Sequence, residues 1–352
     1  MSGRCGNRVR RVRVGVAGAG AMGANHARVL NSLPHLCELV AVYDPDHARA
    51  QAVAARTTAR VCSSLEELLE RVDAVCIASP SGCHPQQVAL ALAAGRDVFV
   101  EKPLALEAAA ARSLRDDVVR GSDRIVQVGH IEHFNPAVRE LRKLAAGEQL
   151  VAVEMQRLSP WHGRIADADV IQDLMLHDVH VLLTLARAPI AGLAAFARHV
   201  RSADRSADHA VATLAFADGL IAALSASRVT EEKVRRLAVT SERAYITLDY
   251  VRRTIEICRS TSLHADARDQ RSYRQESVVE RVFVPPEEPL VAQLGAFLEC
   301  VRERRPPEVD VDDAVRCLEV VEALRRSAGL VRGERGERPV AAAASAIAGV
   351  AA

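Results

Sequence analysis

The sequence predicts an α/β protein of two domains: a doubly wound parallel sheet, then an α+β domain whose large, mostly antiparallel sheet has one open face. Three observations support this prediction. A glycine-rich turn follows the first apolar strand, strand and helix patterns alternate as far as residue 129, and period-2 strand patterns dominate from residue 130 onward. The fold class follows from the order of these patterns.

The glycine-rich turn is Gly18-x-Gly20-x-x-Gly23, at the end of the apolar run 12–17. Gly18 permits a tight turn, Gly20 lets backbone approach a pyrophosphate, and Gly23 lets the next helix pack close to the sheet. Asp44 ends the second apolar run 44 − 23 = 21 residues after the last glycine, near the spacing of about 20 expected for a carboxylate that binds ribose hydroxyls. Together these features predict an N-terminal Rossmann domain that binds NAD. The alternative is an ordinary βα turn with a surface aspartate.

Length and charge narrow the function. The 352 residues exceed the length of about 250 to 300 at which a single core stops growing. Lys+Arg number 46 and Asp+Glu 45, giving 46 − 45 = +1, and the charges are interspersed. This balance favours a small-molecule partner over nucleic acid or a membrane.

Two further features predict a cytoplasmic protein. Apolar stretches are broken before the roughly 20 residues that a membrane-spanning helix needs, and the first residues lack the apolar core of a signal peptide. The eight cysteines include no C-x-x-C pair, and several fall in predicted core segments, so we expect reduced thiols.

The expected domain boundaries follow the changes in pattern. We expect a loose tail over 1–8, the NAD-binding Rossmann domain over 9–129, an α+β substrate and oligomerisation domain over 130–335, and a disordered tail over 336–352.

The first domain is expected to alternate strands and helices. Predicted strands span 12–17, 39–43, 60–62, 74–78, 98–100 and 125–128, and predicted helices 22–33, 47–55, 65–70, 85–94 and 107–119. Ser64 followed by Glu67 is a capping box that starts the third helix, and Gly95 ends the fourth. Continuous apolar strands separated by helices indicate a parallel sheet covered on both faces.

The second domain combines helices with period-2 strands. Helical periods at 136–145 and 170–186 flank a strand at 151–158, period-2 runs follow at 209–216, 220–227, 234–240, 244–249, 253–258 and 277–284, and helices at 288–304 and 311–328 close the fold. Asp218-Gly219 is a hairpin signal. Since the helices cover one face of this sheet, we expect a homo-dimer or homo-tetramer through the other.

Lys102 is the first candidate for chemistry. It follows the strand 98–100, and ligands of doubly wound sheets bind beyond the carboxyl ends of the strands. Burial and nearby positive charge depress the pKa of a lysine, which lets it exchange a proton with a substrate hydroxyl. A lysine that simply extends to solvent is the equal alternative.

Asp173 and His177 are the second candidates. They lie four residues apart in a helix expected to start near Val170, so both fall on one face. A carboxylate beside an imidazole fixes its tautomer and raises its basicity, as a general acid/base histidine requires. A capping aspartate with a core histidine is the alternative. A metal would need His180 as a third ligand, but i, i+4 and i+7 spread around a helix, so we expect no metal.

Taken together, these motifs resemble the Gfo/Idh/MocA oxidoreductases over residues 10 to 330. The motifs are Gly18-x-Gly20-x-x-Gly23-x-x-His26, Ala78-Ser-Pro-x-x-x-His84, Glu101-Lys-Pro103 and Asp173-x-x-x-His177. The resemblance implies an NAD-dependent dehydrogenase with a Rossmann domain followed by an open-faced sheet domain.

The resemblance also implies roles for individual residues. It makes Lys102, Asp173 and His177 catalytic, and it suggests a cis peptide bond between Lys102 and Pro103. The implied cofactor-binding residues are Gly18, Gly20, Ala21, Met22, Gly23, Asp44, Ser79, Pro80, His84 and Glu101.

Within the family, the segment 128–137 and the Arg164-x-x-Asp167 motif look most like the UDP-N-acetylglucosamine 3-dehydrogenases. Those enzymes tend to have arginine where this chain has His133, so a contact to an anionic substrate is altered here. Arg157 is a further candidate, since guanidinium groups suit bidentate phosphate recognition. The candidate substrate residues are His133, Asn135, Arg157 and Arg164, with surface charge as the alternative for both arginines.

The resulting prediction is oxidation of a secondary ring hydroxyl, at C3 of a nucleotide sugar such as UDP-N-acetylglucosamine, to the 3-keto sugar by hydride transfer. His177 would take the hydroxyl proton and Lys102 would stabilise the oxyanion, and the two could exchange roles. The alternative substrate is a cyclitol or free aldose. The alternative function is a non-catalytic NAD-binding regulator.

Overall fold

The chain divides into two compact units. The computed structural model describes residues 11–161, 168–202, 206–266 and 269–331, without the side chains of 260–277. Within these limits the first unit comprises 11–136 with 286–318, and the second comprises 137–285 with 319–331. The tails expected over 1–8 and 336–352 lie outside the described residues.

The first unit contains a six-stranded parallel sheet in the order β3-β2-β1-β4-β5-β6. Its strands are β1 (Val12–Ala17), β2 (Cys37–Tyr43), β3 (Arg60–Val61), β4 (Ala74–Ile77), β5 (Asp97–Glu101) and β6 (Val126–Gly129). This is the strand order of a dinucleotide-binding Rossmann sheet. Successive strands are added on one side of β1 up to β3 and on its other side from β4 onward, while all strands stay parallel. The predicted parallel sheet is confirmed, and every residue of β4 and β5 is buried, as expected for strands covered on both faces.

The helices of this unit follow the predicted pattern closely. They are α1 (Ala21–Asn31), α2 (His47–Ala54), α3 (Leu65–Arg71), α4 (His84–Ala93) and α5 (Ala108–Ser113), the last continued by the π-helical η2 (Leu114–Val119). Ser64 caps α3 by accepting from the Glu67 N–H at 3.1 Å. The Glu67 carboxylate accepts from the Ser63 N–H at 2.8 Å, so the return bond of the capping box falls one residue earlier than predicted. Gly95 ends α4 with φ +70°.

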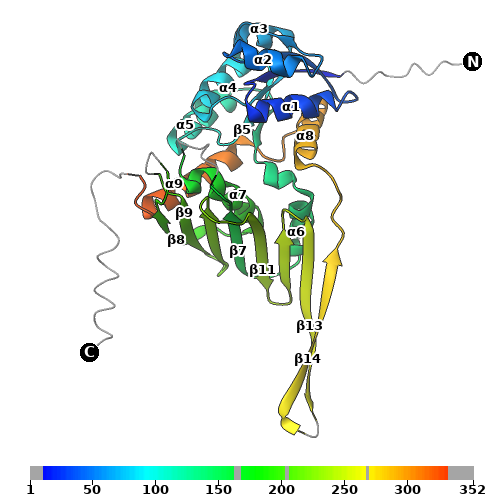
Figure 1. Ribbon diagram of the computed structural model, residues 1–352, viewed down its shortest axis with the longest axis vertical. Helices are drawn as coiled ribbons and strands as arrows, with labels where there is room; N and C mark the ends of the chain where they lie inside the picture. Colours follow the sequence, from blue (N-terminus) through cyan, green and yellow to red (C-terminus); the bar gives the residue numbers. More distant parts are fainter. Residues whose placement is uncertain (1–10, 162–167, 203–205, 267–268, 332–352) are drawn as a thin grey trace, which may run out of the picture. The chain divides into compact units, whose positions relative to one another are not determined.

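One helix of the first unit comes from much later in the chain. α8 (Pro289–Glu303) inserts Leu294, Phe297 and Leu298 into the apolar core that β1 and α1 also line. α1 and α8 pack against each other and lie side by side in Figure 1. The linear boundary expected at 129/130 is therefore refined, because residues 286–318 return to the first unit.

The second unit contains an eight-stranded sheet in the order β14-β13-β12-β11-β7-β10-β9-β8. The strands are β7 (Leu150–Leu158), β8 (Ile190–Arg198), β9 (His209–Phe216), β10 (Ile221–Ser227), β11 (Val234–Ser241), β12 (Tyr245–Asp249), β13 (Thr254–Asp266) and β14 (Asp269–Val282). Only β7 and β10 pair in parallel, so the mostly antiparallel sheet is confirmed. Burial alternates along β9 and β10, as expected for one covered and one open face.

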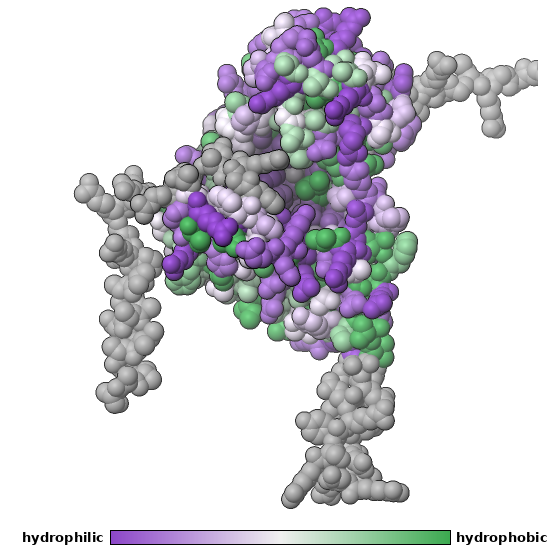
Figure 2. All heavy atoms as spheres, in the orientation of Figure 1, coloured by the Kyte–Doolittle hydropathy of each residue, from purple (hydrophilic) through white to green (hydrophobic). Residues whose placement is uncertain are grey.

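Two features of this sheet differ from the predictions. β8 was not predicted, because its alternation is built from alanine and glycine, and its large outward side chain, Phe196, is 75% exposed. β13 and β14 are longer than predicted and run past the neighbouring strands as a two-stranded ribbon (Figure 1). Hydrophobic residues gather near the described part of this ribbon in Figure 2. Val279 in β14 and Phe283 just after it are exposed.

The remaining helices are α6 (Pro136–Ala146), η4 (Ile171–Met175), α7 (Leu176–Leu185) and α9 (Val311–Ser327). The Asp218-Gly219 turn joins β9 to β10 with Gly219 at φ +92°, which confirms the predicted hairpin. Within the described ranges, none of the helices has the length and apolarity required to cross a bilayer.

Candidate functional site

The glycine turn brings three backbone segments into close contact. Gly18 has φ +96°, and a Cβ there would lie 2.6 Å from the backbone of Ala78 and Ser79, just after β4. A Cβ on Gly23 would lie 1.7 Å from the Gly18 carbonyl oxygen. Side chains are therefore excluded at both positions, because the obstacle is backbone that cannot move aside.

Gly20 differs from these two glycines, because a Cβ there would meet nothing within 4 Å. The residue is the N-cap of α1, and Ala21 and Met22 in the first turn are exposed. The first turn of a helix has unpaired N–H groups and the positive end of the helix dipole, so an anion can approach here. A pyrophosphate fits this open side of the turn.

Asp44 stands at the end of β2 and is 9% exposed. One carboxylate oxygen accepts from the Ala19 N–H at 2.6 Å and the other from the Asp46 N–H at 2.8 Å. Each oxygen keeps a second lone pair, so the carboxylate can still accept hydrogen bonds from ribose hydroxyls. The carboxylate thus joins the glycine turn to the end of the second strand, and both fit the adenosine half of a dinucleotide.

The next residues at this carboxyl edge of the parallel sheet follow β4 and β5. Ser79 donates its hydroxyl to the Gln87 side chain at 2.6 Å, and Pro80 is exposed. Lys102 is half-buried, and the bond between Lys102 and Pro103 is cis, as expected. His84 is 1% exposed with both ring nitrogens against protein carbonyls, so this geometry supports a structural role for it rather than a cofactor contact.

His130 was not among the predicted site residues. It directly follows β6 and is 3% exposed. Burial, then the positive charges of Lys102 and His133, lower its pKa to about 3. His130 is therefore neutral at physiological pH, and it lies near enough to Lys102 for an electrostatic interaction between the two side chains. Its position after a strand of the parallel sheet was the signal that sequence reasoning could have used.

The two predicted substrate residues of this unit are both buried and have protein partners. His133 Nε2 lies 3.3 Å from the Glu308 carboxylate, and Asn135 donates to the Glu132 carboxylate at 3.0 Å. Both residues are 5% exposed. A role for them in substrate binding remains a proposal.

In the second unit, Asp173 and His177 lie on consecutive turns at the start of one helix. Asp169 caps this helix, since its carboxylate accepts from the Ile171 and Gln172 N–H groups at 3.0 Å. The first turn, η4, is π-helical and contains Asp173, while His177 belongs to α7. Short π-helical segments are frequent at functional sites, and periodicity did not predict this one.

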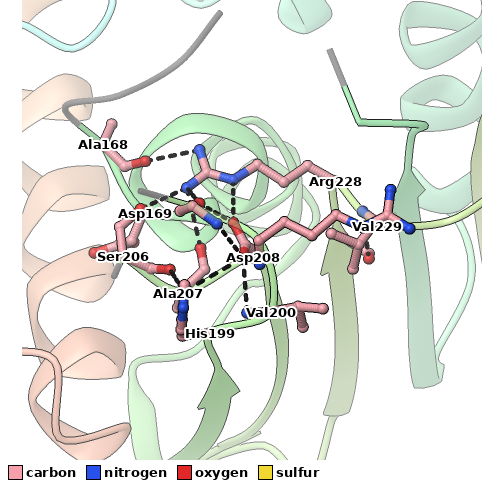
Figure 3. A network of polar contacts seen from close by, with 12 residues as sticks. Ala168, Asp169, His199, Val200, Ser206, Ala207, Asp208, Arg228 and Val229 are labelled. Carbon is pink, nitrogen blue, oxygen red and sulfur yellow. Dashed lines mark hydrogen bonds and ion pairs between the residues drawn. The ribbon is translucent and has the colours of Figure 1, made fainter. Parts of the chain in front are cut away.

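The segments leading into this helix are held by Arg228 (Figure 3). Its guanidinium donates to the Ala168 carbonyl at 2.9 Å, to the Asp208 carboxylate at 2.9 Å and to the Ser206 hydroxyl at 2.6 Å. Asp208 is fully buried and also accepts from the Ser202 hydroxyl. Burial alone would raise the pKa of Asp208, but hydrogen bonds from Ser202 and the Arg201 N–H outweigh it and lower the pKa.

Arg157 is paired inside the protein. Its guanidinium donates to the Asp178 carboxylate at 2.9 and 2.7 Å and lies 5.4 Å from the Tyr250 ring. Arg157 is 3% exposed and Asp178 2% exposed. This pairing fixes α7 beside His177, and a phosphate contact of Arg157 stays an untested prediction. Arg164, the other expected anchor, lies outside the described residues.

No group of three or more metal-binding side chains occurs in the part of the chain that the structure describes. The carboxyl edge of the first sheet has the parts that a dinucleotide needs: a glycine turn open at Gly20, a helix N-terminus and a carboxylate after β2. The strand order and these features together define a dinucleotide-binding oxidoreductase.

Comparison with known proteins identifies the family within this class. Residues 12–130 match the family described as "Oxidoreductase family, NAD-binding Rossmann fold", and residues 148–247 match the "GFO/IDH/MocA C-terminal domain". The chain belongs to the Gfo/Idh/MocA oxidoreductase family, and its cofactor is NAD.

Individual relatives agree with this assignment. The chain is 33% identical to the UDP-N-acetylglucosamine 3-dehydrogenase of Acidithiobacillus ferrooxidans over 70% of its own length and 76% of the relative's. A solved structure of that enzyme superposes with a TM-score of 0.82 at 30% identity, over 92% of this chain and 100% of that one. An inositol 2-dehydrogenase of Acidothermus cellulolyticus is 37% identical, but over only 49% of this chain and 53% of that relative.

The glycine turn leads to a paired test of cofactor binding. Gly23→Ala should destabilise the protein by more than about 2 kcal/mol, because its Cβ would overlap the Gly18 carbonyl. Gly20→Ala should leave stability nearly unchanged and weaken NAD binding about tenfold or more, because its methyl group would occupy the space proposed for the pyrophosphate. Urea denaturation and NAD titration separate the two effects, and full NAD affinity in Gly20→Ala would contradict the proposed binding mode.

Proposed function

We propose that this protein oxidises a secondary ring hydroxyl, at C3 of a nucleotide sugar such as UDP-N-acetylglucosamine, to the 3-keto sugar. The observation that carries the chemistry is Lys102. The chain has 46 basic residues but only three lysines, and one of them follows β5 beside the dinucleotide crevice. An arginine is always charged, whereas a lysine can release a proton. The similarity to a UDP-N-acetylglucosamine 3-dehydrogenase supports the substrate.

The catalytic residues that we propose are Lys102, Asp173 and His177. Bound NAD supplies the hydride acceptor. His177, oriented by Asp173, takes the hydroxyl proton, and Lys102 stabilises the negative charge that develops on that oxygen. The neutral ring of His130 adds no positive charge near Lys102. Lys102 and His177 can exchange these roles without changing the products.

Inositol is the alternative substrate, and one observation favours it. Inositol 2-dehydrogenases match about half of the chain at 37% identity or less. A neutral cyclitol needs no anionic anchor, and in the described residues the arginine expected to serve as one, Arg157, is paired with Asp178. A regulator that only binds NAD is less well supported, since it has no need for an acid/base pair.

We also propose that the open sheet face joins copies of this chain into a homo-dimer or homo-tetramer. Val211, Ile221 and Tyr245 are exposed on outward positions of β9, β10 and β12, and a groove of about 540 Å³ lies between alanine-rich strands on that sheet. The buried thiols of Cys37, Cys62 and Cys76 are not in disulfides, which supports a cytoplasmic location.

The position of Asp44 predicts cofactor preference. NAD should bind at least about tenfold more tightly than NADP, because the carboxylate after β2 would repel a 2′-phosphate. Asp44→Ala should narrow this difference. Fluorescence titrations with NAD and NADP measure this difference in affinity. Tighter binding of NADP to the unaltered protein would contradict the proposed role of Asp44 at the ribose.

Removing the proposed acid/base groups should affect turnover and spare cofactor binding. We expect Lys102→Ala and His177→Ala each to lower kcat by roughly 10² to 10⁴ with little change in NAD affinity. Lys143→Ala is the matched control, because the side chain of Lys143 is 71% exposed and pairs only with Glu140 among the described residues. If both variants keep the kcat of the unaltered protein, the catalytic site lies elsewhere.

The substrate is tested by following NADH fluorescence after adding UDP-N-acetylglucosamine, myo-inositol or free hexoses to protein with NAD. We expect the highest kcat/KM with UDP-N-acetylglucosamine. Preferred turnover of myo-inositol would replace the nucleotide sugar with the alternative. NAD binding without turnover of any of these would favour the regulator.

A further inference from the structure

Two buried histidines contact the first and last residues of the tripeptide Glu101-Lys102-Pro103. His26 on α1 bonds to the Glu101 side chain, and His84 at the start of α4 bonds to the Pro103 backbone. The rings are 0% and 1% exposed, so neither can meet a ligand directly. Both histidines therefore act on the two residues that flank Lys102.

His84 connects two loops at the carboxyl edge of the sheet. Its Nδ1 lies 2.8 Å from the Pro103 carbonyl oxygen, and its Nε2 lies 2.9 Å from the Ser79 carbonyl oxygen. Both partners are acceptors, so each contact needs a ring proton, and a neutral ring has only one. Burial lowers the pKa of His84, although the bonds to both carbonyls oppose this. At neutral pH the ring therefore donates one N–H, and we assign it to Nδ1, whose contact with the Pro103 carbonyl is the shorter of the two.

His26 reaches Lys102 through Glu101. Its Nε2 lies 2.7 Å from Glu101 Oε1, and we assign the proton to Nε2 because an ionised carboxylate can only accept. Glu101 Oε2 accepts from the Lys102 backbone N–H at 3.2 Å. Gly129 on the neighbouring strand leaves room for this carboxylate, since a Cβ there would lie 3.1 Å from Oε2.

We propose that His26 and His84 are positioning residues that fix the backbone on both sides of Lys102 and so aim its amine at the reacting hydroxyl. This inference rests on the proposed catalytic role of Lys102. A lysine side chain has a flexible four-carbon stem, and fixing its rotamers costs about 2 kcal/mol of conformational entropy. The position of the amine therefore depends on how firmly the Lys102 backbone is held. Because His26 lies one helical turn beyond Gly23, the same contact ties Lys102 to the cofactor turn.

Matched substitutions separate these hydrogen bonds from simple packing. The amide nitrogen of asparagine lies near the place of a histidine Nδ1, and that of glutamine near the place of Nε2. His84→Asn should keep the bond to Pro103, and His84→Gln should lose it. For His26 the order reverses, because Glu101 faces Nε2: His26→Gln should keep the bond and His26→Asn should lose it.

The readout is Lys102 itself, observed without substrate. Lysine labelled with ¹³C at the ε carbon gives signals from only three residues, and Lys102→Ala identifies the signal of interest. Lys143 and Lys233 are exposed and serve as internal references. We expect the Lys102 signal to stay in place in His84→Asn and His26→Gln, and to move toward the references in His84→Gln and His26→Asn.

Kinetics should follow the same crossed order. The two disruptive variants should lose about 10² in kcat, the size of effect that a displacement of about 1 Å can cause, while KM for the sugar changes little. A role in packing alone, for example of His26 against the Phe99 ring at 5.1 Å, would affect both substitutions at a position equally. Equal effects, or an unmoved Lys102 signal in all four variants, would overturn the proposal.

The design keeps this proposal separate from the proposed function. If Lys102→Ala retains turnover, the catalytic role of Lys102 fails, and the crossed signal pattern still tests whether the histidines position it. If Lys102→Ala is inactive but the signal pattern is not crossed, the positioning role fails and the function stands. The two substitutions at one histidine are a sufficient test by themselves. If one variant folds poorly, the two substitutions at the other histidine still test the proposal.

Discussion

The first unit depends on the close approach of backbone at Gly18 and Gly23. Because a Cβ on Gly23 would overlap the Gly18 carbonyl, α1 can approach β1 closely only with glycine at this position. The same turn lies against the backbone after β4 and receives the Asp44 carboxylate on the Ala19 N–H. This contact therefore fixes the relative positions of the glycine turn, the Asp44 carboxylate and the strand ends where the chemistry is proposed.

The second unit relies on buried charge instead. Arg228 with Asp208 and Arg157 with Asp178 are almost fully removed from water, and such pairs gain little net stability unless their hydrogen bonds are satisfied. Their value lies in geometry. One pair holds the chain leading into the helix with Asp173, and the other holds the residue after His177. A planar guanidinium that forms several bonds defines both the distance and the direction of its partners.

Most of the fold could be predicted from the sequence, because it was encoded locally. Apolar runs, the glycine turn, the Ser64 cap and the Asp218-Gly219 hairpin each act within a few residues. The return of α8, the small-residue strand β8 and the π-helical turn at Asp173 depend on distant contacts and were not predicted. The same limit applies to the site: residue types indicated Lys102 and His177, but no pattern showed that His84 faces Pro103 or that Arg157 pairs with Asp178.

The return of α8 also has a consequence for how the chain is made. Ribosomes release the N-terminal end first, so the strands of the first sheet emerge long before the helix that completes their core. In the folded protein the rings of Phe99 and Phe297 lie at a centroid distance of 5.8 Å. This contact forms only after Phe297 has been synthesised. The first segment of the first unit ends at residue 136 and α8 begins at 289, so 288 − 136 = 152 residues lie between them. At about 5 to 20 residues per second, the nascent first unit keeps an uncovered apolar surface for roughly 8 to 30 s.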